Sequence, residues 1–234
     1  CLKMKIQKPN TSFQIVAHRG LSQKYPENTV EGFKAALMQH IDMLEIDVHF
    51  TKDKQLVVIH DDSIDRTSNQ KGKVKDFTLE ELKQFDFGIK HGESFKNTCI
   101  STFSEVLSLF KKYSKTLLIE IKKPEQYPGI EKALLEELDK FQIPSHRVII
   151  QSFDVESVKR MSEYTKKYAL GVLISKKQYW YKQPDFENIA SFAQFINPNY
   201  KLINKKFIKR AHEHHLKVIP YTVNNMKDVK KLIH

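Results

Sequence analysis

The stretch MLEIDVHFTKDKQLVVIH, residues 43–60, contains two apolar segments joined by only five residues. In the first segment, 43–50, apolar and polar residues alternate with the period of two that is typical of a β-strand. The segment 56–60 is a second candidate strand. A five-residue link is too short for a crossover between parallel strands, so we predict an antiparallel hairpin that brings His60 back beside Glu45.

Outside this hairpin, short apolar segments alternate with segments of helical period. The other candidate strands are 14–18, 117–122, 148–153, 169–174, 195–197 and 218–223. Amphipathic helices are predicted between most of them, for example along the stripe Ile130, Leu134 and Leu138. Helix starts are predicted at three capping-box pairs, which are Asn28 with Glu31, Thr78 with Glu81, and Thr102 with Glu105. This alternation predicts parallel βαβ units and an α/β fold.

The strand count falls one short of a closed (β/α) barrel. With the hairpin taken as an extension of the second strand, seven parallel strands are predicted, whereas a closed barrel has eight. Either the given chain lacks the last strand and helix, or the count is wrong. Residues 61–114 carry turn residues and two short helical patterns, and we interpret them as an insertion. We expect one TIM-barrel domain over residues 1–234.

The composition favours a folded protein that binds anionic groups. The net charge is +11, but the lysines are spread along the chain, so we expect a solvated surface and no nucleic-acid binding. No apolar segment approaches the roughly 20 residues that cross a bilayer. Two cysteines cannot form a disulfide framework, which favours a cytoplasmic enzyme. Secretion or a lipid anchor at Cys1 is the alternative if a leader preceded it.

Three acidic residues are candidates for a metal site. Glu45 and Asp47 share one face of segment 43–50, and two carboxylates on a buried strand are costly unless a positive charge compensates them. Glu120 likewise points with Lys122 in segment 117–122. An internal Glu–Lys pair or exposed strand ends would explain one strand alone. Two such strands favour a site at the barrel rim, with Mg²⁺ or Ca²⁺ preferred over Zn²⁺.

Two histidines end apolar segments. His18 is followed by Arg19, whose guanidinium can bind phosphate oxygens as a fork, and His60 ends the hairpin. A lone histidine in such a place is more often structural than catalytic. Two of them around an acidic metal cluster fit phosphodiester cleavage, because one can accept a proton from the attacking oxygen and the other can protonate the leaving alkoxide.

Two other segments resemble functional sites less closely. Residues 212–215, HEHH, lack the spacing of a His-Glu-x-x-His zinc site, and we expect solvated surface there. Trp180 lies among Tyr179 and Tyr181 and could contact an apolar substrate or a membrane. A packed loop that caps a helix is the interpretation we prefer.

Together these residues resemble the glycerophosphodiester phosphodiesterase family. The matching motifs, in order and spacing, are HRG (18–20), PENT (26–29), EID (45–47), VVIHD (57–61), EIK (120–122), QSF (151–153) and TVN (222–224). The resemblance implies a TIM barrel with an insertion after strand two. It also implies hydrolysis of glycerophosphodiesters, such as glycerophosphocholine and glycerophosphoethanolamine, to sn-glycerol 3-phosphate and an alcohol, with one divalent cation.

The resemblance also implies roles by position. The metal would be bound by Glu45, Asp47 and Glu120. The acid/base pair would be His18 and His60, with His60 as the acid, and the phosphate would be held by Arg19 and Lys122. Asn28 would line the site, and Phe153 would line the glycerol pocket. The chain departs from the family pattern in two ways. Tyr221 replaces the usual Trp, and the family's closing segment is absent.

Three questions stay open at this point. The same site could act as a lysophospholipase D or on a glycerol-phosphate polymer, with peripheral contact to an anionic membrane or cell-wall polymer. A non-catalytic protein that binds anionic surfaces is a more distant alternative, which the intact His18, His60 and three carboxylates disfavour. The sequence chooses neither between water attack and a cyclic phosphate nor between oligomeric states.

Overall fold

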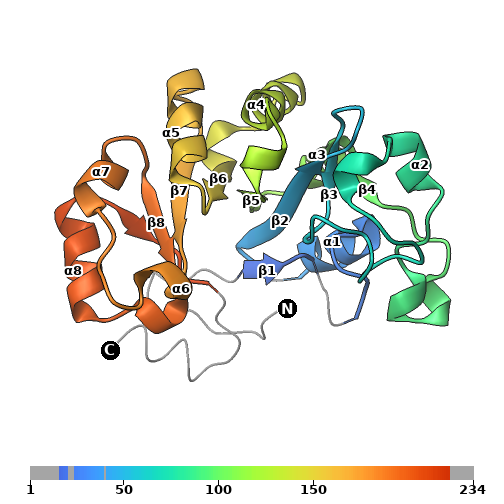
Figure 1. Ribbon diagram of the computed structural model, residues 1–234, viewed down its shortest axis with the longest axis horizontal. Coiled ribbons are helices and arrows are strands. Elements are labelled where there is room, and N and C mark those ends of the chain that lie inside the picture. The colour runs from blue at the N-terminus through green and yellow to red at the C-terminus, as the bar shows by residue number, and fades with distance from the viewer. Residues whose placement is uncertain (1–15, 21–23, 40, 222–234) are drawn as a thin grey trace. The chain divides into compact units, whose positions relative to one another are not determined.

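Residues 16–20, 24–39 and 41–221 are described by a computed structural model, which divides after Val148 into two parts (Figure 1). Each part carries helices together with strands that pair into sheet. Among the described residues, the helices are too short or too polar to span a lipid bilayer.

The first part is organised around strand β2, which is buried along its whole length. It comprises β1 (Val16–His18), β2 (Met43–Phe50), β3 (Leu56–Val58), β4 (Ser101–Thr102) and β5 (Thr116–Ile121). Strand β2 pairs in parallel with β1 and β5, and it pairs with β3 as the antiparallel hairpin that the sequence predicts. The short strand β4 extends the sheet beyond β3.

The parallel strands bring their carboxyl ends to one edge. His18 pairs with Glu45 in the β1–β2 register, and Asp47 pairs with Glu120 in the β2–β5 register. The hairpin continues past β3, because the backbone N–H of Ile59 donates to the Asp47 carbonyl at 3.0 Å. Residues far apart in sequence therefore meet at this edge.

Three of the four α-helices described in the first part begin at a threonine whose side chain caps the helix. They are α1 (Val30–Leu37), α2 (Leu79–Lys83), α3 (Phe103–Phe110) and α4 (Ile130–Lys140), with 3-10 turns η1 (Val74–Asp76), η2 (Ile89–His91), η3 (Glu93–Phe95), η4 (Pro124–Gln126) and η5 (Ser145–Arg147). Thr78 and Thr102 cap α2 and α3 as predicted. The prediction for Asn28 is wrong. Thr29 caps α1 by accepting a hydrogen bond from the Gly32 N–H, while Asn28 takes a left-handed conformation with φ 55°.

The predicted insertion packs a small core of its own against the hairpin. This core is formed by Val57, Ile59, Ile64, Val74, Leu82, Phe87 and Ile100, all of them buried. The first two belong to the hairpin, so the insertion is fixed to the strand that ends near His60. The insertion contains α2, three 3-10 turns, β4 and α3. Strand β4 was not expected, because two residues show no periodicity.

The second part is a separate run of parallel strands and helices. Its strands are β6 (Val148–Ser152), β7 (Ala169–Ile174), β8 (Phe195–Pro198) and β9 (Lys217–Val218), paired in that order. Its helices are α5 (Val155–Tyr164), α6 (Lys176–Tyr179), α7 (Phe186–Ala190) and α8 (Lys205–Glu213), with the 3-10 turn η6 (Tyr200–Leu202). Beyond β9, Tyr221 bridges to Asn199, and the predicted TVN motif and terminal helix lie outside the described residues.

Candidate active site

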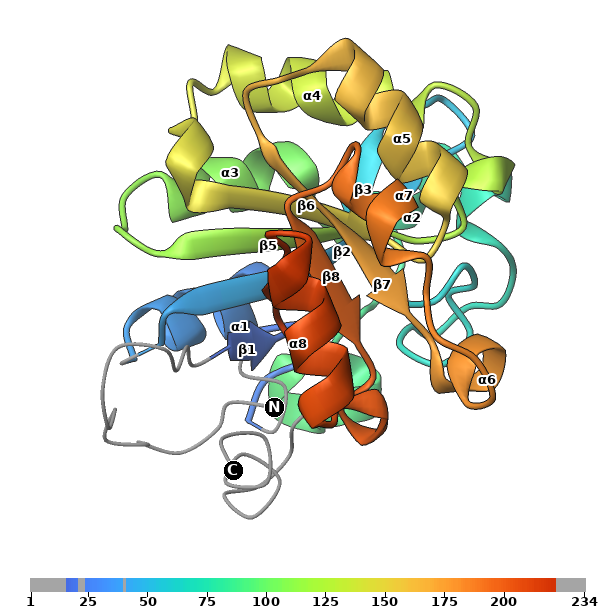
Figure 2. The same ribbon diagram turned by 90° about the vertical axis from the view of Figure 1, so that its left-hand side faces the viewer.

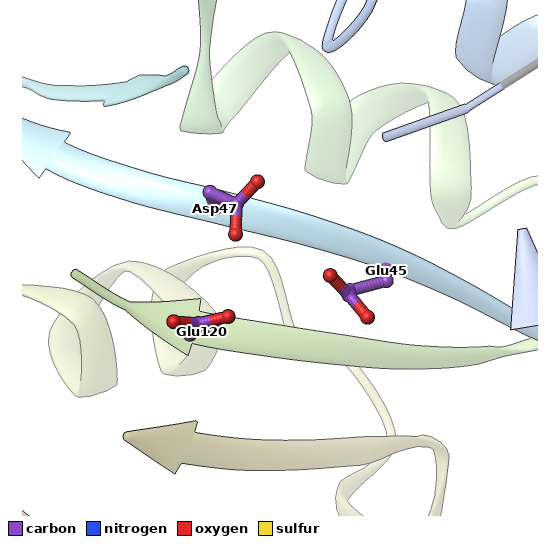
Figure 3. Close-up of side chains that lie close together, drawn as sticks. All are labelled: Glu45, Asp47 and Glu120. Carbon is purple, nitrogen blue, oxygen red and sulfur yellow. The ribbon is translucent and has the colours of Figure 1, made fainter. Parts of the chain in front are cut away.

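Three carboxylates converge at the carboxyl-end edge of the first part. Glu45 and Asp47 project from β2 and Glu120 from β5, toward one another (Figure 3). One oxygen from each lies within 4.8 Å of the others. The three residues are 8%, 0% and 5% exposed, respectively. Three acids in so small a buried volume repel one another, and this repulsion needs compensation.

Burial and mutual repulsion change the acidity of this cluster. Burial, followed by the charge of Asp47, raises the pKa of Glu120 to about 8. Burial, followed by the charge of Glu45, also raises the pKa of Asp47. Lys122 opposes both shifts, since its Nζ lies 2.9 Å from Glu120 Oε2 and 4.0 Å from Asp47 Oδ1. One lysine does not neutralise three acids.

Two buried oxygens in the cluster accept no hydrogen bond from any described residue. They are Asn28 Oδ1 and Asp47 Oδ1. Asn28 Nδ2 donates to the other Asp47 oxygen, at 3.4 Å, and this places its carbonyl oxygen near the cluster. Buried oxygens without donors are costly, and a hard divalent cation prefers such carboxylate and amide oxygens. The donor set therefore fits a divalent metal ion.

A chain of ion pairs connects His60 to Arg19. The Nδ1 atom of His60 lies 2.8 Å from Asp61 Oδ1. Arg66 donates to Asp61 through Nε, at 2.8 Å, and Nη2, at 3.1 Å. Arg66 also pairs with Glu27, whose other oxygen accepts from Arg19 Nη1 at 3.0 Å. The hydrogen bond from Arg66 holds the pKa of Asp61 well below its usual range. Asp61 is therefore an anion that fixes the His60 ring.

The backbone of His60 is held by a second, fully buried histidine. His49 Nε2 lies 3.1 Å from the His60 carbonyl oxygen, and its Nδ1 lies 2.6 Å from the Tyr127 hydroxyl. Burial lowers the pKa of His49 to about 4, so the ring is neutral at pH 7. Because a carbonyl only accepts, Nε2 carries the hydrogen and Nδ1 accepts from Tyr127. His49 therefore positions His60 rather than binding a metal.

Most of the predicted site residues meet in this region. Arg19 Nε lies 3.9 Å from Asp47 Oδ2, and a pocket whose lining includes Glu27, Asn28 and His60 adjoins the cluster. The seven predicted residues that the first part brings together are Arg19, Asn28, Glu45, Asp47, His60, Glu120 and Lys122. Sequence reasoning missed Glu27, Asp61, Arg66 and Tyr127 as partners. Glu27 and Asp61 lie within the PENT and VVIHD motifs, which could have indicated them, whereas only contacts across the fold identify Arg66 and Tyr127.

Two predicted residues stand apart from this description. His18 ends β1 opposite Glu45, but its side chain lies outside the described residues. Phe153 follows β6 in the second part, where its ring meets Tyr221 edge to face with centroids 5.6 Å apart. The roles assigned to both residues stay predictions.

The predictions for the HEHH segment and for Trp180 have different outcomes. Residues 212, 213 and 215 of the HEHH segment are exposed, as predicted, and across the described ranges only the three carboxylates have the geometry of a metal cluster. Trp180 lies just after α6 as predicted, but it is 71% exposed. The preferred interpretation of a packed loop is therefore wrong.

Comparisons with known proteins identify the family of this chain. The family model described as the glycerophosphoryl diester phosphodiesterase family matches residues 18–234. A glycerophosphodiester phosphodiesterase of Caldanaerobacter subterraneus subsp. tengcongensis is 37% identical over 94% of this chain and 89% of its own length. A glycerophosphodiester phosphodiesterase of Bacillus subtilis is 34% identical over 93% of this chain and 79% of its own.

Solved structures show the same fold. An Oleispira antarctica phosphodiesterase in complex with the product sn-glycerol-3-phosphate has a TM-score of 0.83 and 25% identity, and covers 94% of this chain and 88% of its own. A glycerophosphodiester phosphodiesterase from Thermotoga maritima has a TM-score of 0.75 and 26% identity, and covers 96% and 92%. Fold and acidic site thus define an α/β-barrel phosphoric diester hydrolase. The chain belongs to the glycerophosphoryl diester phosphodiesterase family. The predicted family, fold class and enzyme class are confirmed.

Proposed function

We propose that this chain hydrolyses glycerophosphodiesters, such as glycerophosphocholine and glycerophosphoethanolamine, to sn-glycerol 3-phosphate and the free alcohol. The observation that carries the proposal is the set of three buried carboxylates within 4.8 Å, next to Arg19, Lys122 and His60. The Oleispira antarctica relative, which binds the product sn-glycerol-3-phosphate, supports the glycerol half of the substrate.

Glu45, Asp47 and Glu120 would hold one divalent cation, Mg²⁺ or Ca²⁺, since their oxygens are hard donors. When bound, that ion stabilises negative charge on the phosphate oxygens. Asn28 orients Asp47 through its hydrogen bond of 3.4 Å. This contact explains why an asparagine in a left-handed conformation precedes α1.

Arg19 and Lys122 bind the phosphate from two sides. Arg19 Nη1 donates a hydrogen bond to Glu27 Oε2 at 3.0 Å, and Arg19 Nε lies 3.9 Å from Asp47 Oδ2. Lys122 is only 20% exposed and is held by Glu120. Burial acts to lower the pKa of Lys122, but the charges of Glu120 and Asp47 raise it above its usual value, so the side chain remains a cation that can pair with a phosphate oxygen.

The two histidines transfer the protons. Asp61 accepts a hydrogen bond from Nδ1–H of His60, so Nε2 is the atom that exchanges a proton. His60 Nε2–H protonates the alkoxide as the phosphorus–oxygen bond to the alcohol breaks. His18, opposite Glu45 at the end of β1, accepts the proton of the attacking oxygen. That oxygen belongs either to water or to the glycerol hydroxyl, the latter through a cyclic phosphate.

Release of the phosphate monoester and the free alcohol from each member of a panel of diesters tests the proposal. The panel contains glycerophosphocholine, glycerophosphoethanolamine, lysophosphatidylcholine and a glycerol-phosphate polymer. We expect turnover of the first two, loss of turnover in EDTA, and recovery with Mg²⁺ or Ca²⁺. Turnover confined to the lipid or the polymer would redirect the substrate assignment. No product from any diester with either metal would refute the proposal.

The role of His60 is tested with two leaving groups. His60→Ala should lower turnover of glycerophosphocholine by roughly 10²–10⁴, the usual loss of an acid/base group. The loss should be much smaller with glycerol phosphate p-nitrophenyl ester, because nitrophenolate departs without a proton. The exposed residue His212 provides the matched control, His212→Ala, which should behave as wild type. Equal losses on both substrates would exclude His60 as the acid.

A further inference from the structure

The loop that follows β7 exposes large aromatic side chains. Residues 175–184, SKKQYWYKQP, contain three lysines and three aromatic residues but no acid. Trp180 is 71% exposed and Tyr181 is 63% exposed. A single exposed aromatic residue is common on proteins, but adjacent ones among lysines indicate a contact surface.

The loop after β8 lies at the same edge of the second part. Strands β7 and β8 are parallel, and their last residues, Ile174 and Pro198, are paired, so both loops leave the sheet side by side. Helix α6 lies beyond the arrowhead of β7 (Figure 2) and contacts η6. Residues 199–206, NYKLINKK, again contain no acid. We call residues 176–182 together with 200 and 201 the aromatic–lysine patch.

The fold anchors this patch at both ends. Ser175 begins α6 by accepting a hydrogen bond from the Gln178 N–H at 3.3 Å, and Pro184 and Phe186 are buried where the loop ends. The Trp180 and Tyr181 rings pack on each other, with centroids 5.2 Å apart at 67°. The two rings are therefore presented at the surface by a short loop with fixed ends.

The ring faces in the patch lie next to lysines. Lys182 Nζ is 5.4 Å from the centre of the Tyr179 ring and 5.6 Å from that of Tyr181. Lys201 Nζ is 5.9 Å from the centre of the Tyr200 ring. On the three tyrosines, these ammonium groups occupy a ring face on which a nucleic-acid base would otherwise stack. A bilayer interface instead favours amphipathic rings beside lysines, with anionic headgroups around them.

We propose that the aromatic–lysine patch docks the enzyme on an anionic lipid surface, with Trp180 and Tyr181 at headgroup level and the four lysines of the patch against lipid phosphates. The charge of the patch is complementary to such a surface, and so is the chain's net charge of +11. This docking is independent of catalysis, since it needs neither metal nor substrate.

Trp180 provides a direct test because it is the only tryptophan in the chain. Fluorescence excited selectively at tryptophan, and not at the nine tyrosines, therefore reports on the patch alone. Measured in EDTA, emission should shift to the blue with vesicles of phosphatidylcholine mixed with phosphatidylglycerol, and not with phosphatidylcholine alone. High salt should reverse the shift. Brominated lipids should quench the emission, because the indole would lie near the acyl chains.

Lysine variants separate the patch from the general charge of the protein. Lys176→Gln with Lys177→Gln should weaken vesicle association by about 30-fold, since each lysine near an anionic surface contributes about a factor of five. The matched control is Lys111→Gln with Lys112→Gln, an exposed pair in the first part that loses the same charge. Trp180→Ala, followed by co-sedimentation, should also weaken association. Circular dichroism confirms that each variant is folded.

Three outcomes would overturn the proposal. One is the absence of any spectral shift or co-sedimentation with anionic vesicles. Another is an equal loss in the control pair, which would assign the attraction to diffuse charge. The third is tighter binding of a labelled single-stranded oligonucleotide than of vesicles, with a loss in the same variants. Enzyme activity is not part of any readout, so the outcome is separate from that of the proposed function.

Discussion

The two parts of the chain each bury a cluster of polar side chains from parallel strands, and the two clusters satisfy their polar groups in different ways. In the first part, Glu45, Asp47 and Glu120 carry like charges, and Asp47 keeps a buried oxygen without a donor among the described residues. In the second part, Asn197 Nδ2 donates to Gln151 Oε1 at 2.7 Å, and Asn197 Oδ1 accepts from the Ile219 N–H at 3.0 Å.

A glycine makes the second cluster possible. Gly171 on β7 lies in register with Gln151, and a Cβ atom there would come within 3.0 Å of Asn197 Nδ2. The absent side chain lets the two amides meet across the middle strand. Amides offer both donors and acceptors, so they satisfy each other, whereas ionised carboxylates only accept. The second cluster is complete within the protein, and the first requires a cation.

The largest expected effect comes from removing one charge of the first cluster. Glu120→Gln should lower turnover of glycerophosphocholine by more than about 100-fold, because even groups that only orient metal ligands contribute roughly 10–100-fold. The rise in melting temperature that Mg²⁺ or Ca²⁺ causes in the wild type should also disappear. That rise corresponds to about 2.7 kcal/mol when the metal is at 100 times its Kd. Calorimetry and product release measure the two effects.

The second cluster supplies the matched variant. Asn197→Leu leaves the Ile219 N–H and the Gln151 carbonyl oxygen without partners, so we expect the free energy of unfolding to fall by about 1–3 kcal/mol. The stabilisation by metal should persist, in contrast to Glu120→Gln. If the asparagine variant also loses its response to metal, the two clusters are not distinct in the way the hydrogen bonds indicate.

The last prediction concerns the effect of pH in the absence of metal. The pKa of Glu120 is raised by burial from 4.5 to about 8, so the folded state binds more protons than the unfolded state between these values. Unfolding free energy in EDTA should therefore fall as pH rises through this window, by up to about 1.4 kcal/mol per pH unit.

Urea titrations across this window should give a smaller slope for Glu120→Gln than for the wild type. Saturating metal should abolish the slope in the wild type, because Glu120 is then deprotonated in the folded state as it is in the unfolded state. The exposed residue Glu136 provides the control, Glu136→Gln, which should keep the wild-type slope. Identical slopes for all three proteins would contradict the assignment of the buried charge.

Elements with a strong hydrophobic period were predicted well from the sequence, whereas the choice between neighbouring capping residues was predicted poorly. Segment 43–50 was predicted with the bounds of β2 because its alternation of apolar and polar residues is unbroken. The two carboxylates in this segment also indicated the position of the site. Asn28 was misassigned as a cap because Thr29, one residue later, is an equally good cap, and only the fold selects between them. Arg66 lies 39 residues from Glu27, and Tyr127 lies 78 from His49. No local pattern connects such pairs.

The ion pair between Arg66 and Glu27 limits how far this enzyme could be shortened. Arg66 belongs to the insertion, yet it holds both the aspartate that orients His60 and the glutamate that orients Arg19. A designer who removed residues 61–114 to obtain a minimal barrel would keep all three proposed metal ligands. The contacts that orient His60 and Arg19 would nevertheless be lost. A compact derivative would need both a carboxylate in place of Asp61 and a guanidinium in place of Arg66.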